Sequence, residues 1–399
     1  MYRLMTSPLV IRRNGSRQRG VALLMVISTL VLVTSVVADF QYNSRVDLQL
    51  AMNSRDKLQA EYNALSVLRL FSLVIKQSRQ LQDALGGLMK TLGVDPQAMP
   101  SISQMIQMVP MECGLLSTIA KPRKESSLSV DEEKEKSSEP DFFPGECLAT
   151  TTSEHAKISI NLLAQRTNGV DRRIAELLGG LLSDPKLERH FQEDDKNGTH
   201  AENPLQLVGA IADWVDNNKV ESTNEVTDED RHYTGLKDSY HTKNAPFDSI
   251  DELQLVHGVD DELFALLKDH VTIYSDTTAI EIATATPLQI GAGLLASKRA
   301  GVSVVDMIPG LLTLVKGMNE LRGKSMGMFT LTMTILLTLV EQAALTPYVD
   351  VNRLRQVFTD HASNTWYTLV SEGRVGNASV TLRAVFQARE GKFYYFRME

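Results

Sequence analysis

The stretch Arg17-Gln18-Arg19-Gly20-Val21-Ala22-Leu23-Leu24-Met25 decides how this chain is organised, because a basic segment meets an apolar one at Gly20. The range 21–38 contains no charged residue, no Gly and no Pro. As a helix it would span roughly 27 Å at about 1.5 Å per residue, close to the thickness of a bilayer core. The sequence therefore predicts one transmembrane helix over residues 21–38.

The charges on either side of this apolar segment predict its orientation. Arg12, Arg13, Arg17 and Arg19 precede it, whereas Asp39 follows it. Positively charged flanks remain on the cytoplasmic side of a membrane. We therefore expect a single-pass membrane protein with a cytoplasmic N-terminus and a translocated body.

The composition predicts a folded, acidic body. The chain has 399 residues, of which 43% are hydrophobic, and a formal net charge of −8. The first twenty residues include five arginines and no acid, so the body after them is more acidic than the whole chain. Such a body repels nucleic acid and anionic lipid, and it can attract cations.

The junction at Gly20 and Val21 resembles the processing site of type IV prepilins and pseudopilins. In that family a prepilin peptidase cuts after the Gly, and the apolar helix stays as an anchor. The resemblance implies a leader over residues 1–20 and a mature chain that begins at Val21. Most members have Glu at the fifth mature position, where this chain has Met25. A subunit without that Glu suits a terminal place, as in the K-type minor pseudopilins (GspK) of type II secretion systems.

Other segments resemble the same K-type family. The longest begins with Asp213-Trp214-Val215-Asp216 and includes Lys243-Asn244-Ala245-Pro246-Phe247. Shorter ones are Ala156 to Leu163 and the run Ser371-Glu372-Gly373-Arg374-Val375-Gly376. The resemblance implies a structural subunit that contacts other minor pseudopilins at the tip of a periplasmic fibre, and that helps to start or cap the fibre during protein export.

We expect an α+β fold in which a long N-terminal helix packs on a small antiparallel sheet. The transmembrane segment should continue as an amphipathic helix through residues 21–85, until Gly86-Gly87 interrupts it. Alternating residues predict a strand over 156–163 and three C-terminal strands. The pseudopilin body would comprise residues 86–165 and 346–399. The C-terminal strands are expected at Trp366–Arg374, Ala378–Ala388 and Phe393–Met398.

Between these two parts, residues 166–345 are expected to form an inserted helical domain. Ser249 followed by Glu252 is a helix-start signature, and Gly258 with a second helix from Asp260 predicts a SAM-like or helix-hairpin-helix-like unit. The uncharged run 325–340 contains several threonines and is short for a membrane span, so it is expected in the core.

Only two cysteines are present, Cys113 and Cys147. In an oxidising compartment they are expected to form a disulfide, and the alternative is two free, buried thiols.

An acidic, turn-rich loop follows Trp214. Its candidate Ca²⁺ ligands are Asp213, Asp216, Asn218, Glu229 and Asp230, because Ca²⁺ needs six to eight converging oxygens at about 2.3–2.6 Å. The spacing does not match an EF-hand, and a solvated acidic loop is the alternative. The resemblance favours calcium, because the helical domain of K-type subunits binds it in this region.

The motifs of common enzyme classes are absent from the sequence, and the histidines show no metal-binding spacing, so they are expected at the surface. We therefore expect no catalytic residue and no small-molecule substrate. One rival hypothesis is a membrane-tethered DNA receptor that uses the helix-hairpin-helix-like unit. The acidic body opposes it, because DNA binding needs a basic surface. A second rival, a membrane-anchored periplasmic hydrolase, is supported only by dispersed acids.

Overall fold

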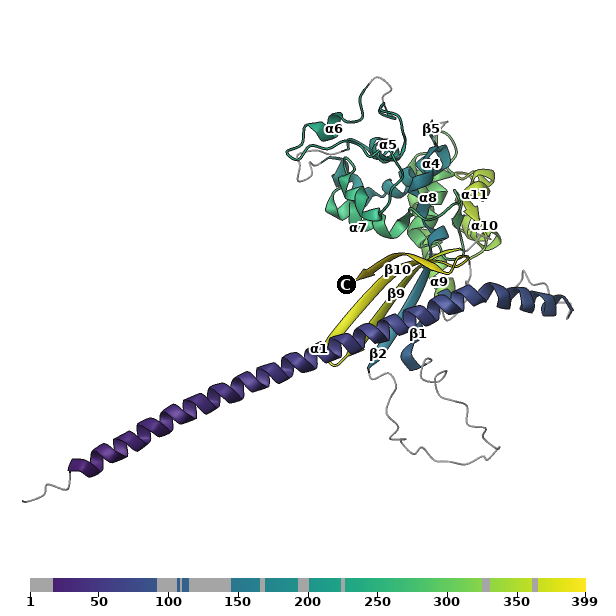
Figure 1. Ribbon diagram of the computed structural model, residues 1–399. Coiled ribbons are helices and arrows are strands. Elements are labelled where there is room, and N and C mark those ends of the chain that lie inside the picture. Colours follow the sequence, from purple (N-terminus) through teal and green to yellow (C-terminus); the bar gives the residue numbers. More distant parts are fainter. Residues whose placement is uncertain are drawn as a thin grey trace, which may run out of the picture.

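The computed structural model describes residues 17–91, 106–107, 110–114, 145–165, 169–192, 201–223, 227–324, 331–360 and 365–399. A long helix, α1 (Arg17–Thr91), crosses one face of a small sheet, and a helical domain lies above that sheet in the view of Figure 1. The expected α+β architecture is therefore confirmed. Residues 1–16, which belong to the expected leader, fall outside the described part.

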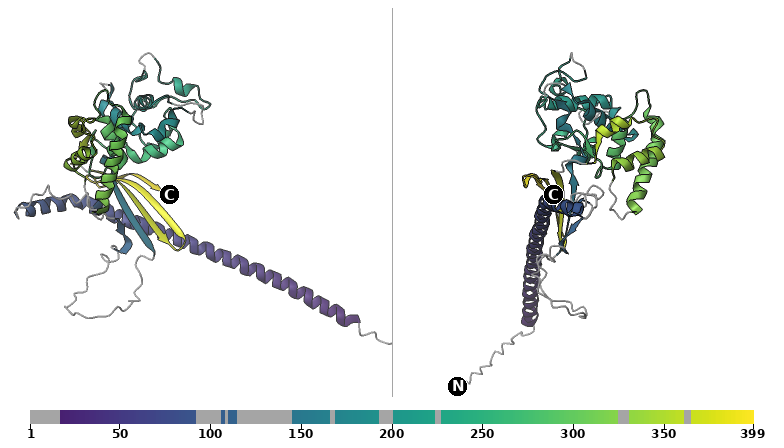
Figure 2. Two further views of the ribbon diagram at one scale, coloured as in Figure 1. Left: turned by 180° about the vertical axis from the view of Figure 1, so that it is seen from behind. Right: turned by 90° about the vertical axis from the view of Figure 1, so that its right-hand side faces the viewer.

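The N-terminal half of α1 projects beyond the rest of the molecule (Figures 1 and 2). Within Gly20–Ser78, an 18-residue window has a mean hydropathy of 2.6, and none of it is buried. Leu24 and Val36 are each 69% exposed. This helix is long and apolar enough to cross a membrane, as the sequence predicted.

Helix α1 does not stop at residue 85 but continues through Gly86-Gly87 to Thr91. Glycine within a helix costs only about 1 kcal/mol relative to alanine, so two glycines weaken a helix without ending it. The expected break at this point was wrong.

The sheet has five antiparallel strands in the order β1-β2-β9-β10-β11. The three C-terminal strands were predicted almost to the residue, and the turns between them use Gly376 and Gly391 at positive φ. The strand bounds are β1 (Met111–Glu112), β2 (Glu146–Ser153), β9 (Trp366–Val375), β10 (Ala378–Gln387) and β11 (Lys392–Met398).

The strand expected over 156–163 was wrong. That segment forms two 3₁₀ turns, η2 (Glu154–Ala156) and η3 (Ile160–Leu162), around the two-residue β3 (Ile158–Ser159). The sheet strand β2 lies upstream, and its buried face includes Thr151 and Ser153, while Leu148 points outward. Apolar alternation therefore did not reveal it.

Helix α1 and the sheet share one apolar core. Ala60, Ala64, Leu68 and Phe71 of α1 are buried against β9 and β10. Small side chains at the first two positions let the helix backbone lie close to the strands. The partners on the sheet include Tyr367, Leu369, Val380, Leu382 and Phe386.

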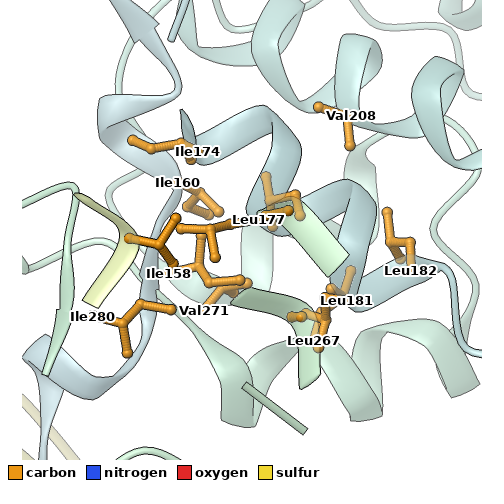
Figure 3. Close-up of a cluster of buried hydrophobic side chains, with 14 of the residues drawn as sticks. Ile158, Ile160, Ile174, Leu177, Leu181, Leu182, Val208, Leu267, Val271 and Ile280 are labelled. Carbon is orange, nitrogen blue, oxygen red and sulfur yellow. The ribbon is translucent and has the colours of Figure 1, made fainter. Parts of the chain in front are cut away.

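The helical domain occupies the connection between β2 and β9 and has its own core, part of which is shown in Figure 3. The isoleucines of the misassigned segment, Ile158 and Ile160, belong to this core, where they lie near Ile174 and Leu177 of α4. Its main helices are α4 (Arg172–Leu182), α5 (Pro204–Val215), α6 (Arg231–Thr234), α7 (Asp261–His270), α8 (Pro287–Ala296), α9 (Val304–Lys324), α10 (Met333–Gln342) and α11 (Val351–Val357).

Shorter elements complete the domain. They are η4 (Pro185–Phe191), η5 (Ile250–Leu255), β4 (Ala164–Gln165), β5 (Gly169–Val170), β6 (Val271–Thr272), β7 (Ile280–Glu281) and β8 (Phe358–Thr359). The apolar run predicted to be a core element forms α10, where Leu336, Leu339 and Val340 are buried. Residues 325–330 of that run lie outside the described part.

Candidate functional site

The acidic loop begins where α5 ends. Asp216 follows the last helical residue, and its backbone N–H still bonds to the carbonyl of Ala212. The chain then folds back through a β-bridge between Val220 and Asp228. This return brings Glu229 close to the end of α5.

Four carboxylates of this loop are largely withdrawn from solvent. Asp213, Asp216, Glu221 and Glu229 are only 4%, 8%, 5% and 2% exposed. Asp213 accepts a hydrogen bond of 2.8 Å from the backbone N–H of Ser222. Burying several like charges is costly unless protons or a cation neutralise them.

The acid–base properties of the loop show this cost. Burial raises the pKa of Asp213 to about 7, and the charges of Asp216 and Glu229 add to the effect. Burial also raises the pKa of Asp216 and of Glu229, although hydrogen bonds from Asn218 and Thr242, respectively, oppose it. Three neighbouring carboxyls therefore favour a neutral form or a bound cation.

Several buried oxygens in this region have no hydrogen-bond donor among the residues that the structure describes. They are Oε2 of Glu221, Oε2 of Glu229 and Oδ1 of Asn244. Glu221 has an ion pair, because Arg231 lies 3.1 Å from that oxygen. Asn244 adopts a left-handed backbone with φ of 53°, a conformation that asparagine tolerates better than most residues. The donor-free oxygens of Glu229 and Asn244 are chemically suited to a hard cation.

The remaining predicted ligands, Asn218 and Asp230, serve the loop itself. The side chain of Asn218 accepts a bond from the N–H of Val220 and donates one to Asp216. Burial alone would raise the pKa of Asp230, but hydrogen bonds from Thr242 and His241 lower it. These two residues therefore form hydrogen bonds within the loop, and Asn244 and Glu221 each have a buried oxygen although they were not among the predicted ligands.

The cluster is not a finished metal site. Among the residues that the structure describes, no three Asp, Glu, His or Cys side chains are arranged as a group that could hold a metal ion. A cation would have to draw the carboxylates together or use amide, main-chain or water oxygens as well. The residues present fit Ca²⁺ by donor type and burial, because Ca²⁺ tolerates irregular sets of oxygen ligands.

Aromatic packing holds the loop in place. The Trp214 ring contacts the rings of Tyr233, Tyr240 and Phe247, with centroid distances of 5.9, 6.4 and 6.3 Å. Lys243 forms ion pairs with Asp248 and Glu252. The aromatic and charged residues of this motif therefore stabilise the shape of the domain.

The helix-hairpin-helix-like unit differs from the expected one in its first helix. The Ser249–Glu252 capping box is present, but it starts the 3₁₀ helix η5, whereas α7 is an α-helix. In the hairpin, the N–H of His257 bonds to the Tyr233 hydroxyl and the N–H of Val259 to the carbonyl of Val256. These amides are used within the protein, which favours a packing role over phosphate binding.

The predicted disulfide is confirmed. Cys113 and Cys147 are bonded, with their Cα atoms 5.0 Å apart. The bond ties the residue after the short edge strand β1 to the second residue of β2. It therefore fixes one edge of the sheet.

A buried polar cluster at the junction of sheet and helical domain was not predicted. Glu154 accepts hydrogen bonds from Thr272 of β6 and Thr368 of β9 and pairs with Lys157. Burial alone would raise the pKa of Glu154, but the Lys157 charge and these bonds lower it. The helical domain and the sheet are thus linked through hydrogen bonds to one carboxylate.

The next residue, His155, is fully buried, so the expectation of surface histidines was wrong here. Its ring nitrogens lie 3.0 Å from Ser275 Oγ and 3.3 Å from Thr365 Oγ1. Only the three-dimensional structure reveals that His155 lies between Ser275 and Thr365, because the sequence around His155 has no distinguishing motif.

The fold defines a class of protein. A long helix with an unpacked apolar N-terminal half lies on an antiparallel sheet through its second half, which is the architecture of pilin-like subunits. The helical domain between β2 and β9 is an addition to this architecture.

Comparisons with known proteins show similarity to the same family. The model for type II secretion system (T2SS), protein K, first domain, matches residues 156–276. Type II secretion system protein K of Klebsiella pneumoniae is 24% identical over 312 residues, which cover 77% of this chain and 76% of that protein. These matches confirm the resemblance to the K-type family that the sequence motifs indicated.

A solved structure shows weaker similarity. The GspK–GspI–GspJ complex from the type 2 secretion system of enterotoxigenic Escherichia coli contains a chain that is 18% identical. The match covers 66% of this chain and 84% of that chain, with a TM-score of 0.41.

Proposed function

We propose that this minor pseudopilin lies at or near the tip of a type II secretion pseudopilus, where it contacts other minor pseudopilins and helps to start or cap the fibre. The observation that carries this proposal is the combination of one unpacked apolar helix with a large domain inserted between two neighbouring strands. The apolar helix can pack against the helices of other subunits in the fibre. The inserted domain would obstruct the stacking of another subunit above this one.

The exposed half of α1 supports the assembly part of the proposal. Apolar side chains along its first turns are more than half exposed, and covering them gains about 25 cal/mol per Å². A membrane covers them before assembly, and helices of neighbouring subunits cover them afterwards. Met25 in place of an acidic residue suits a subunit with no neighbour above it.

The proposed topology follows from the same helix. Residues 1–20 are a leader that prepilin peptidase removes after Gly20, and the helix from Val21 anchors the chain once in the inner membrane. The acidic body then lies in the periplasm, where the disulfide is stable.

Calcium binding by the acidic loop is the second part of the proposal. Asp213, Asp216 and Glu229, assisted by Asn244, would hold the ion, while Asn218 and Asp230 position the loop. The cation would remove the repulsion between buried carboxylates and so stabilise the helical domain. The donor-free oxygens of Glu229 and Asn244 favour this over a solvated acidic loop.

The experiment that tests the tip location is immunogold labelling of sheared pseudopili with an antibody against the helical domain. Gold at one fibre end is the expected result. An antibody against the main fibre subunit is the control and should label the whole length. Gold from the first antibody along the whole fibre would refute the tip assignment.

A further inference from the structure

The sheet has two unequal edges. At one edge, β1 is only two residues long and is followed by a disulfide-bonded cysteine. At the other edge, β11 is seven residues long and follows β10 in the strand order, and the residues that the structure describes place no further strand beside it. Long uncovered edges readily pair with another strand, so proteins usually protect them.

The main-chain groups of β11 alternate in direction. Glu399 and Thr381 exchange both N–H to carbonyl bonds, at 2.8 and 3.1 Å. In an antiparallel pair the next such positions on this strand are Arg397 and Tyr395, so the N–H and C=O groups of Phe396 and Met398 point away from β10. A bulge beside Val385 disturbs the other half of the strand. The regular half presents main-chain donors and acceptors to an incoming strand.

The side chains of this half differ between its two faces. Phe396 and Met398 lie on the same face as Leu382 and Ala384, their partners in the α1-facing core, but they are 50% and 46% exposed. Arg397 lies on the opposite face, across from Arg383. The edge therefore offers apolar contacts on one face, and Tyr395, Arg397 and Glu399 on the other.

The charged face borders a cavity of about 350 Å³ between the sheet and the helical domain. Its aromatic lining includes Phe264 and Tyr395, and its cations are Lys157, Lys268, Arg383 and Arg397. Lys157 is paired with Glu154 at 2.6 Å, and Arg397 lies 3.4 Å from Glu399 and 3.9 Å from Asp251.

The other two cations of the cavity are not neutralised. In the part of the chain that the structure describes, no carboxylate forms an ion pair with Arg383 or Lys268. Cations that lack a paired carboxylate attract an acidic group that comes close to them. The cavity thus favours an acidic neighbour for β11.

We propose that the C-terminal half of β11 and this cavity form a docking site for an extended segment of another protein, which adds a strand to the sheet. The segment alternates apolar residues, which cover Phe396 and Met398, with acidic residues, which face Arg397 and Arg383. Main-chain bonds supply affinity, and the alternation of side chains supplies specificity. The site does not depend on where the subunit lies in a fibre.

The test uses the full chain in detergent micelles and a fluorescent nine-residue peptide of alternating valine and glutamate. Saturable binding by fluorescence anisotropy is expected. Replacing the glutamates by glutamine should weaken it about tenfold, and N-methylation of alternate amides should abolish it. Amides of Phe396 and Met398 should exchange more slowly when the peptide is bound.

Protein variants complete the test. Arg383→Gln should weaken binding about tenfold without changing the melting temperature, whereas Arg389→Gln, an exposed residue outside the cavity, should not. Equal binding of the N-methylated peptide would overturn strand addition, since charge alone would then explain it. Absence of saturable binding up to about 1 mM, or self-association through β11, would also overturn the proposal.

Discussion

Gly373 of β9 lies directly against the backbone of Ala60 in α1. A Cβ atom at position 373 would be 2.0 Å from the Ala60 carbonyl oxygen and 2.9 Å from the Ala64 nitrogen. Because backbone atoms cannot move aside as a flexible side chain can, only glycine allows this distance between helix and sheet. The first glycine of the Glu-Gly-Arg-Val-Gly motif is therefore required for the close packing of β9 on α1.

We predict that Gly373→Ala lowers the free energy of unfolding by about 1–3 kcal/mol through overpacking. Chemical denaturation of the detergent-solubilised chain measures the change. Gly179→Ala is the matched control, because a Cβ there meets no atom within 4 Å. The control should be neutral or stabilising by up to about 1 kcal/mol. Equal effects of the two substitutions would contradict the close-approach explanation.

Removing the disulfide should weaken the edge of the sheet. The cysteines are separated by 34 positions, and in the chain-entropy model such a cross-link contributes about 3–4 kcal/mol. The double variant Cys113→Ser with Cys147→Ser should unfold at correspondingly lower denaturant concentration. Without reductant, denatured wild-type protein should resist alkylation at both thiols. Full alkylation in that sample would show that the bond is absent from the protein in solution.

The mature chain should begin at Val21 and retain its apolar helix. N-terminal sequencing of protein extracted from membranes measures this directly. Gly20→Val should prevent processing, while Gly15→Val, inside the leader, should not. A mature terminus after Ala38, or an intact Met1, would contradict processing of the prepilin type.

Calcium should raise the melting temperature of the helical domain. A site that is filled only in the folded state stabilises by RT ln(1 + [L]/Kd), or about 2.7 kcal/mol at a hundredfold excess over Kd. Glu229→Gln or Asp216→Asn should remove most of this gain. Asp238→Asn changes an exposed acid in the same region and should keep it.

Thermal unfolding with calcium, with magnesium and with a chelator distinguishes the alternatives. Coincident curves with calcium and with the chelator would leave only a solvated acidic loop. An equal response to magnesium would indicate general screening of the carboxylates, since Mg²⁺ demands a smaller and more regular site.

The stability of the metal-free protein should depend on pH through Asp213. The pKa of this carboxyl is about 7 in the folded chain, above its usual value near 4. Its protonated form is therefore favoured by folding, and its contribution is full below about pH 4 and is lost as the pH rises toward 7. Between pH 7.5 and 5.5 the wild type should gain up to about 2 kcal/mol relative to Asp213→Asn.

Denaturation in the presence of chelator at the two pH values measures this difference. Saturating calcium should remove it, because the ion and the proton compete for the same carboxylate. If the pH dependence of stability is identical in the wild type and in Asp213→Asn, protonation of Asp213 does not contribute to it.

The sequence by itself determined the features that depend on local pattern. Residues 21–38 predicted the membrane helix, because an apolar run of that length without charges is typical of a transmembrane segment. The alternation after Trp366 and the turns at Gly376 and Gly391 predicted the C-terminal strands, since period and turn chemistry are local properties. The family motifs indicated the inserted domain.

Only the tertiary structure decided what depends on residues far apart in the chain. Strand β2 was hidden because its buried face consists of small and polar residues, whose burial comes from α1 and not from their own hydrophobicity. Asn244 joins Glu229 through folding of the loop, and Glu154 joins Thr368 through closure of the whole sheet. Contacts between residues so far apart leave no periodic pattern in the sequence, because periodicity reflects only the local secondary structure.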